Sequence, residues 1–483
     1  MPSESLFKSY VRHETILKEV LARITPSREE KAKLEAAADK TLKLAAELSA
    51  QYKGKPMLVG SLVRDTWLAD KNEFDVFILF PPAMARKRLE EVGLDLGRQI
   101  IERLGGTYKI AYAEHPYVSG SYAGISIDVV PCYAVKSAGE IKSAVDRTPF
   151  HVKYITERLP AEAAGDVRLL KRFCKAIGVY GADTKTTGFS GYVCELLVIA
   201  YGSFIEVLKG VSEWAPGDIT DIEKVYEAKD YPKLQREFKE QPLILVDPTD
   251  KKRNTAAAIS AESFYLLKKA ATRFLADPSK EIFFPKPAES ITEAEFIKKH
   301  NERKTELILL KFTPPNVVPD ILWPQLRRTA ERLESILIEN DFAVLRSDVY
   351  SNESDLAVIL LEMEISGLPK VQKRIGPKIF DVDDSKRFIE KYKPQSITGP
   401  FVENNFWVAE VKRKFLTAYD KLMDSLNETV DILKAKGMPS HVAEELAKGF
   451  ELISDARKMM SIARKDKNFG IFLRRYFEKE SLA

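Results

Sequence analysis

A short apolar strand that carries carboxylates constrains this chain more than any other feature. The segment EFDVFILF, residues 73–80, holds Glu73 and Asp75 two positions apart, and side chains with that spacing point to the same face of a β-strand. A second apolar segment, GISIDVVPCY, contains Asp128. If the two strands pair, three carboxylates meet on one face. Such a cluster is costly to bury unless cations neutralise it.

Magnesium ions bound together with substrate phosphates are the usual solution, so the pattern predicts metal-dependent phosphate chemistry. The alternative is an edge strand whose outer face is simply charged. The run VFILF disfavours this alternative, because the run is apolar on both faces, as in a covered strand. Just upstream, Gly60 and Ser61 form a predicted turn, and residues 61–69 are predicted to form a short helix whose free N–H groups can hold an anion. Such a turn before a helix is common and alone favours no function; its closeness to the acidic strand is what suggests a phosphate site.

Length and charge limit the classes of protein that remain. A chain of 483 residues is too long for one core, and about three domains are expected. With 75 basic and 71 acidic residues the net charge is only +4, so a nucleic-acid partner would be held by local patches. Three cysteines without a CxxC pattern indicate reduced thiols in a cytoplasmic protein. The apolar stretch 191–208 carries Glu195 and Glu206 and predicts a buried helix, with no membrane span.

The first 150 residues are predicted to form a small α/β unit. Ser27 and Glu30 fit a capping box that begins a helix running to about residue 52. Strands are expected around 56–60 and 73–80, a helix over 86–104, and then several strands with turns at Gly120 and Gly124. We expect a mixed sheet with helices on one face and the carboxylates in the sheet itself.

The rest of the chain divides at a proline-containing segment. Residues 151–287 are mainly helical in pattern, and FFPKPAES is the best linker candidate. Beyond it, strand patterns at 305–312, 341–350 and 354–365 alternate with a helix at 323–340, which suggests a ferredoxin-like α/β fold. Residues 406–415 are predicted to add one more strand, and residues 438–465 to be helical.

For two sets of residues, spacing alone does not decide between a functional role and a structural one. Lys171 and Tyr180 lie nine residues apart across a helix end, where a solvated basic face with a core tyrosine is favoured over a polyphosphate site. Basic clusters fall mostly in the last third of the chain, with aromatic residues interleaved. They suit either an RNA-backbone surface or ordinary solvated faces.

A series of segments in fixed order resembles one family. The segments are VGSLVRDTWL, EFDVFILFP, YAEHPYV, IDVVPCY, IKSAVDRTPFH, VRLLKRFCKAIGVYGAD, GFSGYVCELLV, VDPTDKKRN, WPQLRR, IGPKIF and GPFVENN. They resemble the archaeal-type (class I) CCA-adding tRNA nucleotidyltransferases of the polymerase β superfamily. The resemblance implies an α+β multidomain protein, with a polymerase β-like palm as head (1–150), a helical neck (151–287) and a body and tail (288–483).

The resemblance also implies roles for individual residues. Glu73, Asp75 and Asp128 would bind two Mg²⁺ ions for nucleotidyl transfer from CTP and ATP. The residues implied to contact the nucleotide are Ser61, Arg64, Thr148, His151, Lys171, Tyr180 and Arg253, the last in nucleotide choice. The partner implied is tRNA, held at its acceptor stem and TΨC arm, with Lys412, Arg413, Arg474 and Arg475 as contacts. A homodimer is a further expectation from the family.

Two rival functions remain. Another terminal nucleotidyltransferase, such as a poly(A) polymerase or an oligoadenylate synthetase, would share the carboxylates and the GS turn. The segments VDPTDKKRN and RTPFH and those of the tail favour the CCA-adding group. A catalytically silent RNA-binding homologue is the second rival, and the intact Glu73, Asp75 and Asp128 disfavour it.

Overall fold

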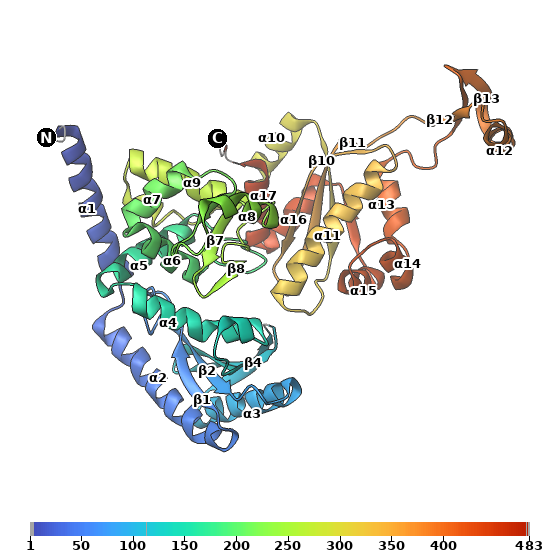
Figure 1. The fold of residues 1–483 in the computed structure, drawn as a ribbon. Coiled ribbons are helices and arrows are strands. Elements are labelled where there is room, and N and C mark those ends of the chain that lie inside the picture. Colours follow the sequence, from blue (N-terminus) through green and yellow to red (C-terminus); the bar gives the residue numbers. More distant parts are fainter. Residues whose placement is uncertain (1–3, 113, 480, 482–483) are drawn as a thin grey trace. The chain divides into compact units, whose positions relative to one another are not determined.

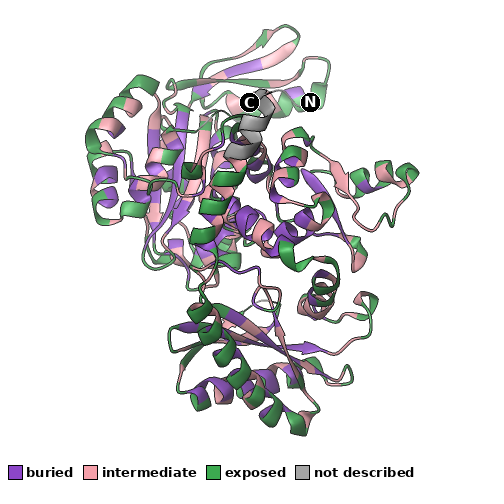
Figure 2. Ribbon diagram, turned by 90° about the vertical axis from the view of Figure 1, so that its left-hand side faces the viewer, coloured by how far each residue is buried: buried purple, intermediate pink, exposed green. Residues whose placement is uncertain are grey.

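The computed structural model describes residues 4–112, 114–479 and 481 (Figure 1). The described residues divide into two compact units, one reaching from the N-terminal part to Lys286, the other beginning at Pro287. Pro285 and Pro287 lie at the junction, where proline interrupts regular backbone hydrogen bonding. In both units, buried residues follow the central strands and the inward faces of the helices (Figure 2).

A five-stranded mixed sheet forms the first part of unit 1. Its strands, in spatial order, are β1 (Lys55–Val59), β2 (Glu73–Phe80), β5 (Ile125–Tyr133), β4 (Pro116–Tyr122) and β3 (Thr107–Tyr112). Only β2 and β5 pair in parallel. Helices α2 (Arg28–Ser49) and α3 (Arg86–Leu104) pack on one face of this sheet. The predicted capping box at Ser27 and Glu30 is confirmed.

Three local predictions for this part were wrong. Helix α4 (Thr148–Arg158) covers part of the second sheet face through Val152, because alternate residues of the central strands are apolar there too. Residues 61–65 form turns rather than a helix, closed by the Thr66 amide donating to the Ser61 carbonyl. Gly120 lies inside β4, where a Cβ atom would meet Ile101 of α3 at 2.5 Å.

The remainder of unit 1 is mainly helical. Its helices are α1 (Glu4–Ile24), α5 (Ala164–Ala176), α6 (Gly191–Tyr201), α7 (Phe204–Glu213), α8 (Tyr231–Glu237) and α9 (Ala261–Ala276). A small sheet of β6 (Asp218–Thr220), β7 (Leu243–Asp247) and β8 (Asp250–Asn254) lies among them. The core includes edge-packed Phe173, Phe204, Phe274 and Phe283. Helix α4 extends from the predicted head across residue 150 into the predicted neck.

The apolar stretch 191–208 is buried, as the sequence predicted, but it forms two helices rather than one. Helix α6 has Val193–Val198 inside the core, and the chain breaks at Gly202 and Ser203 before α7, whose Phe204, Val207 and Leu208 are also buried. Within the part of the chain that the structure describes, no single helix has the length and apolar character needed to cross a membrane. Helices α6 and α7 meet the length and composition criteria only as a pair, and they are bent by 93° relative to each other.

Unit 2 is built on a four-stranded antiparallel sheet. Its strands run in the order β10 (Ala343–Ser351), β11 (Ala357–Ile365), β9 (Glu306–Phe312) and β15 (Glu451–Ile453). With α11 (Pro319–Ile338) between β9 and β10, this is the predicted ferredoxin-like order. One face is covered by α11, α13 (Ala418–Leu426), α14 (Val430–Ala435) and α15 (Ser440–Lys448). The other is covered by α10 (Glu293–Arg303), α16 (Ala456–Lys465) and α17 (Lys467–Phe477).

Two predictions for unit 2 need correction. The predicted helix over 438–465 is interrupted by β15, whose Leu452 and Ile453 are buried at the sheet edge. Residues 406–412 form β14, which lies outside the ferredoxin-like sheet. It is the centre of a separate three-stranded lobe with β12 (Val371–Lys378), β13 (Ser396–Glu403) and helix α12 (Val382–Tyr392), drawn at the upper right of Figure 1.

A buried carboxylate ties this second unit together. Glu362 of β11 is fully buried and accepts hydrogen bonds from Arg303 Nη2 (2.9 Å), Thr305 Oγ1 (2.6 Å) and Tyr476 Oη (2.9 Å). We predict that Glu362→Gln destabilises the fold by about 3 kcal/mol, because it leaves the Arg303 guanidinium without its charged partner. Amide hydrogen exchange along β9 and β11 measures the change. The control is Glu451→Gln at the exposed pair with Lys311, which should cost less than about 0.5 kcal/mol; equal effects would contradict the assignment.

Candidate active site

The parallel pairing of β2 and β5 brings the three predicted carboxylates together. Asp75 lies directly opposite Asp128, and Glu73 lies opposite Ser126. Because side chains alternate along a strand, all three carboxylates project from the face that also holds Phe77, away from α2 and α3. The same row of residues continues across the antiparallel strands to Ser119 of β4 and Lys109 of β3.

The electrostatics of this row show carboxylates without sufficient counter-charge. Burial, reinforced by Asp128 and Glu73, raises the pKa of Asp75 to about 7. Burial also raises the pKa of Asp128, although a hydrogen bond from Ser119 and the charge of Lys109 oppose it. The Oδ1 atom of Asp128 is buried without a hydrogen-bond partner. Glu73 is half exposed and paired with Lys71.

These donors fit divalent cations. Hard oxygen ligands, a buried unpaired oxygen and an elevated carboxyl pKa are what a Mg²⁺ site shows before its ion binds. In the described ranges, no three Asp, Glu, His or Cys side chains already converge as a ligand set. Gly60 allows the preceding turn to approach this site, because its φ is +84° and a Cβ atom there would lie 2.9 Å from Asp75 Oδ2.

A basic inner pocket of about 200 Å³ adjoins the carboxylates. Its lining residues are Gly60, Ser61, Arg64, Thr66, Trp67, Leu68, Lys71, Glu73, Lys171, Tyr180, Gly191 and Tyr192. The structure therefore places Ser61, Arg64, Lys171 and Tyr180 around one space together with Glu73. Since residues 61–65 form turns, any anion held there meets turn amides and the Ser61 hydroxyl rather than a helix N-terminus.

The fully buried Glu195 organises the cations of the inner pocket. Its carboxylate pairs with Arg64 Nη2 at 2.8 Å and Lys171 Nζ at 3.1 Å. The Thr66 hydroxyl also donates to it, at 2.6 Å. Burial raises the pKa of Glu195, but Lys171 and Arg64 outweigh burial, so the net pKa is lowered. Burial lowers the pKa of Lys171. With two cations around one carboxylate, this group keeps a net positive charge beside the acidic row.

The interpretation of Lys171 as part of a solvated basic face was wrong. The residue is only 3% exposed, and its ammonium also donates to the carbonyl and hydroxyl oxygens of Thr66. Glu195 was not among the functional residues predicted from the sequence. The available signal was a single carboxylate at position 195 within the apolar run GYVCELLVIAY, where burial demands a partner.

A larger outer cleft of about 1070 Å³ adjoins the inner pocket at Tyr192, which lines both. Its other lining residues include Glu114, Ile141, Val145, Arg147, Thr148, His151, Ser190, Phe238, Asp250, Lys252, Arg253 and Thr255. The structure thus brings Thr148 and His151, from α4, to the same cleft as Arg253 from β8. All these residues belong to unit 1.

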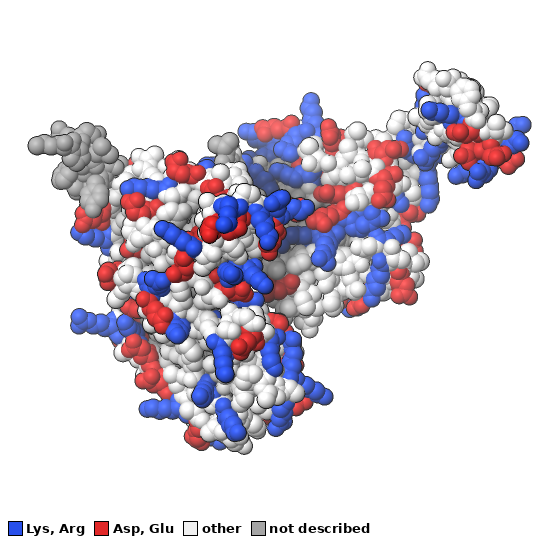
Figure 3. Space-filling view, in the orientation of Figure 1, with Lys and Arg blue, Asp and Glu red and all other residues white. Residues whose placement is uncertain are grey.

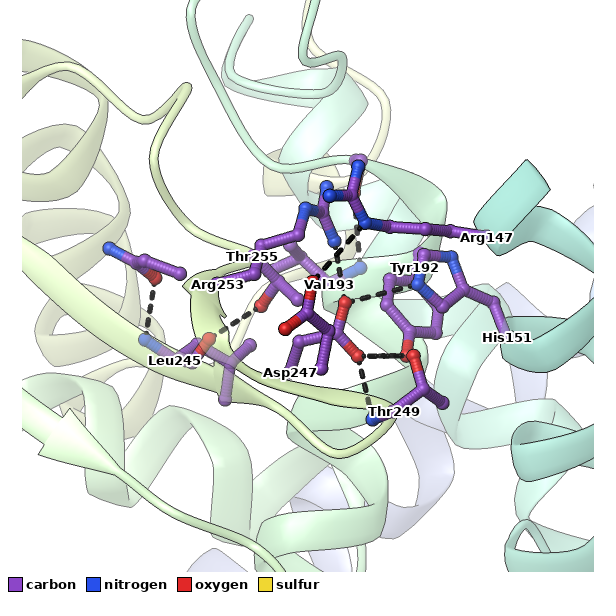
Figure 4. Close-up of polar contacts among 12 residues, drawn as sticks. Arg147, His151, Tyr192, Val193, Leu245, Asp247, Thr249, Arg253 and Thr255 are labelled. Carbon is purple, nitrogen blue, oxygen red and sulfur yellow. Dashed lines mark hydrogen bonds and ion pairs between the residues drawn. The ribbon is translucent and has the colours of Figure 1, made fainter. Parts of the chain in front are cut away.

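Asp247, at the end of β7, lies at the centre of the polar contacts beside this cleft (Figure 4). Its carboxylate receives Arg253 Nη1 at 2.7 Å, lies 3.0 Å from His151 Nε2 and accepts a bond from the Tyr192 hydroxyl at 3.3 Å. Sequence reasoning missed this residue too. The available signal was a carboxylate that directly follows the apolar run LILV.

The basic residues expected to contact RNA have different surroundings. Arg413 pairs with Asp341, and Arg474 pairs with Glu295 at 2.7 Å and donates to the Glu289 carbonyl. Lys412 and Arg475 are exposed. In Figure 3, basic and acidic side chains are mixed over the visible surface of unit 2, including the lobe of β12–β14.

The mixed sheet with three carboxylates on one face, beside a basic pocket, defines a nucleotidyltransferase head. Comparison with known families agrees over most of the chain. Residues 40–151 match the family described as "Nucleotidyltransferase domain", residues 165–284 match "tRNA nucleotidyltransferase, second domain", and residues 303–455 match "CCA-adding enzyme, C-terminal domain". Nucleotidyltransferases of this family generally use divalent metal ions.

Curated relatives extend the likeness to nearly full length. A "CCA-adding enzyme" of Methanosarcina mazei is 37% identical over 95% of this chain and 97% of its own length. Proteins of the same name from Methanocaldococcus jannaschii and Haloarcula marismortui are each 36% identical, over 91% and 96% of this chain and 96% and 98% of their own lengths. The chain therefore belongs to the family of CCA-adding enzymes.

Solved structures show a weaker likeness. A cytoplasmic RNA terminal U-transferase matches with a TM-score of 0.43 and 15% identity, over 56% of this chain and 98% of that one.

The raised pKa of Asp75 gives a test of the metal site that needs no enzyme assay. Folding raises this pKa from 3.8 to about 7. The free energy of unfolding of the wild type therefore falls as the pH rises between those two values, because Asp75 ionises more readily in the unfolded chain. A rise of about three pKa units corresponds to roughly 4 kcal/mol, and 1 kcal/mol moves Tm by about 2–4 °C in a domain of a few hundred residues. Without Mg²⁺, Asp75→Asn should therefore be the more stable protein at pH 8, by roughly 10 °C in Tm. The difference should vanish near pH 4.

Added Mg²⁺ should raise the Tm of the wild type and leave that of Asp75→Asn nearly unchanged. The matched control is Glu102→Gln on the exposed face of α3, which should keep the full response to Mg²⁺. An Asp75→Asn variant that is less stable than wild type at pH 8, or that responds to Mg²⁺ like the wild type, would refute the site.

Proposed function

We propose that this chain adds and repairs the 3′-terminal CCA of tRNA without a template, using CTP and ATP and releasing pyrophosphate. The observation that carries the proposal is the placement of seven candidate residues around two adjoining spaces. Ser61, Arg64, Lys171 and Tyr180 line the inner pocket, whereas Thr148, His151 and Arg253 line the outer cleft. The carboxylates of β2 and β5 adjoin the inner pocket through Glu73.

The inner pocket suits the triphosphate of the incoming nucleotide. Arg64 and Lys171 supply positive charge there, and Glu195 fixes where that charge lies. Ser61 and the turn amides around it offer hydrogen-bond donors. Tyr180 lines the same pocket, and burial keeps the pKa of its phenol well above the usual value, so the hydroxyl stays protonated and able to donate.

The carboxylates suit the transfer step. Glu73, Asp75 and Asp128 would hold two Mg²⁺ ions, which when bound activate the 3′-hydroxyl of the tRNA and neutralise the triphosphate. In the transfer, a bond forms between the 3′-oxygen and the α-phosphorus while the bond from that phosphorus to the pyrophosphate oxygen breaks. The protein's contribution is to hold the two reactants in line and to stabilise charge.

The outer cleft suits the nucleobase and the end of the RNA. At about 1070 Å³ it exceeds the space that one nucleobase fills, and Arg253, His151 and Thr148 supply polar groups along its wall. Unit 2 would hold the acceptor stem and TΨC arm by shape and phosphate contacts, as suits A-form RNA. The free, buried cysteines suit a cytoplasmic location. A homodimer stays a prediction.

Extension of a tRNA that lacks its 3′ end tests the proposed function. CTP alone should add two residues, and CTP with ATP should complete CCA and then stop. Unlimited addition of A, or activity that requires double-stranded RNA, would instead indicate one of the rival nucleotidyltransferases.

Asp128→Ala tests the role of the carboxylates in the same assay. We expect addition to fall by about 10³-fold or more, because the variant removes a ligand of the ions that stabilise the transferring phosphate. Binding to tRNA should persist. Glu102→Ala, on the opposite side of the sheet, should leave the rate unchanged, and equal rates in both variants would contradict the assignment.

Arg475 and its neighbour give a matched pair for the RNA surface. Arg475→Gln should weaken tRNA binding and reduce the slope of log affinity against log salt by about one, because Arg475 is exposed. Arg474→Gln should mainly lower stability, since Arg474 is occupied by Glu295 and backbone carbonyls. Salt titration of tRNA binding measures both, and an unchanged slope for Arg475→Gln would show that it is only solvated surface.

A further inference from the structure

The buried carboxylate of Asp247 takes no part in the proposed transfer step. The residue ends β7, a strand whose five residues are all buried, and its side chain is 0% exposed. A carboxylate in such a position needs strong partners, because burying an unpaired charge is costly. Its partners all come from residues in or next to the outer cleft.

Both oxygens of Asp247 are fully occupied. Oδ1 accepts bonds from the Thr249 amide (2.9 Å), the Thr249 hydroxyl (2.8 Å) and the Tyr192 hydroxyl (3.3 Å). Oδ2 contacts Arg253 Nη1 (2.7 Å) and His151 Nε2 (3.0 Å). A carboxylate offers about four lone-pair sites, so little capacity remains for a substrate or an ion. Asp247 is therefore suited to hold other side chains rather than to react.

Burial would raise the pKa of Asp247. The hydrogen bond and charge of His151 outweigh burial, together with the hydrogen bonds from Thr249 and Arg253, and hold this pKa far below its usual value. The carboxylate thus stays ionised across the physiological range. Its anchoring of Arg253 is a charge-assisted hydrogen bond, the stronger class of such bonds.

The side chains held by Asp247 come from different elements. His151 projects from α4, Tyr192 from α6 and Arg253 from β8. His151 also stacks on Tyr192, with ring centroids 4.0 Å apart and planes at 17°. One carboxylate therefore fixes three groups that otherwise depend on separate helices and a hairpin, as Figure 4 shows.

Among the side chains that Asp247 holds, Arg253 is the one that the family resemblance implies in nucleotide choice. Its Nη1 is directed to Asp247, and its side chain is 36% exposed in the cleft, so its other N–H donors remain for a ligand. On their pairing edges, cytosine and adenine present an acceptor ring nitrogen beside an amino group. Uracil and guanine present an N–H donor beside a carbonyl. A fixed cationic donor aimed at the ring nitrogen favours the first pair of bases and repels the second.

We propose that Asp247 is a positioning residue for nucleobase selection, which fixes the Arg253 guanidinium against His151 and Tyr192 so that the outer cleft accepts cytosine and adenine and rejects uracil and guanine. The inference rests on the proposed function. It assigns to Asp247 no contact with the substrate. Loss of its charge should loosen Arg253 and lower discrimination while the carboxylate row and the inner pocket stay intact.

The test is steady-state addition to tRNA by Asp247→Asn, with CTP, ATP, UTP and GTP measured separately. We expect the ratio of kcat/KM for CTP over UTP to fall about tenfold or more, mostly through a higher KM for CTP, because the loss concerns binding of the base. A fall in kcat of equal size for all four nucleotides, with unchanged ratios, would overturn the proposal.

A double-mutant cycle separates positioning from a merely structural role. In an Arg253→Ala background, Asp247→Asn should change the CTP/UTP ratio by less than about twofold, because the group it positions is gone. An undiminished effect in that background would contradict the proposal. Asp166→Asn is the matched control: Asp166 is a partly buried carboxylate that accepts from the Phe204 amide at 2.7 Å, away from the cleft, and it should lower Tm without changing the ratio.

Thr249→Val keeps the inference testable if Asp247→Asn does not fold. It removes one hydroxyl bond to the carboxylate and leaves all charges in place, so the ratio should shift in the same direction by about two- to threefold; an unchanged ratio would count against the proposal. Failure of the wild type to add C or A would refute the proposed function itself. Normal wild-type addition with an unaltered ratio in the variants would refute only the role of Asp247.

Discussion

The parallel pairing of β2 with β5 is the contact on which the rest of unit 1 depends. It places Asp75 beside Asp128 with no residue between them, in strands whose other residues are largely buried. Like charges in such a position are unfavourable until cations arrive. The neighbouring turn at Gly60, the basic inner pocket and the half-exposed Glu73 all lie around this pair, so that an incoming triphosphate and its metal ions can supply the missing positive charge.

Two further buried carboxylates organise the cationic side of the site. Glu195 holds Arg64 and Lys171 at the inner pocket, and Asp247 holds Arg253 beside His151 at the outer cleft. Long basic side chains lose much rotamer freedom when a ligand orders them. An anion that orders them beforehand reduces that cost and fixes the geometry. The two anions lie on α6 and β7, in the mainly helical part of unit 1. That part therefore positions the cations that complement the carboxylates of the five-stranded sheet.

Much of the fold was predictable because the sequence patterns were long and periodic. The carboxylate-bearing strand, α3, the buried helix α6 and the ferredoxin-like order of unit 2 follow from apolar periodicity and capping. The short segments failed. Residues 61–65 have helix-like composition but form turns. Strand β15 is three residues long inside a helical pattern. In both segments, tertiary contacts outweigh local propensity. Glu195 was missed because its partners Arg64, Thr66 and Lys171 are distant in the sequence. For Asp247, the contacts with His151 and Tyr192, which lie on other helices, could not be seen in the sequence around it.

The central claim is that the carboxylates of β2 and β5 act on the transferring phosphate through divalent metal ions. Addition of CTP in which a non-bridging α-phosphate oxygen is replaced by sulfur tests it most directly, because Mg²⁺ binds sulfur poorly and Mn²⁺ binds it better. We predict that one of the two phosphorothioate isomers reacts much more slowly than CTP in Mg²⁺ and that Mn²⁺ restores most of its rate. An equal loss of rate in both metals, for both isomers, would contradict the claim.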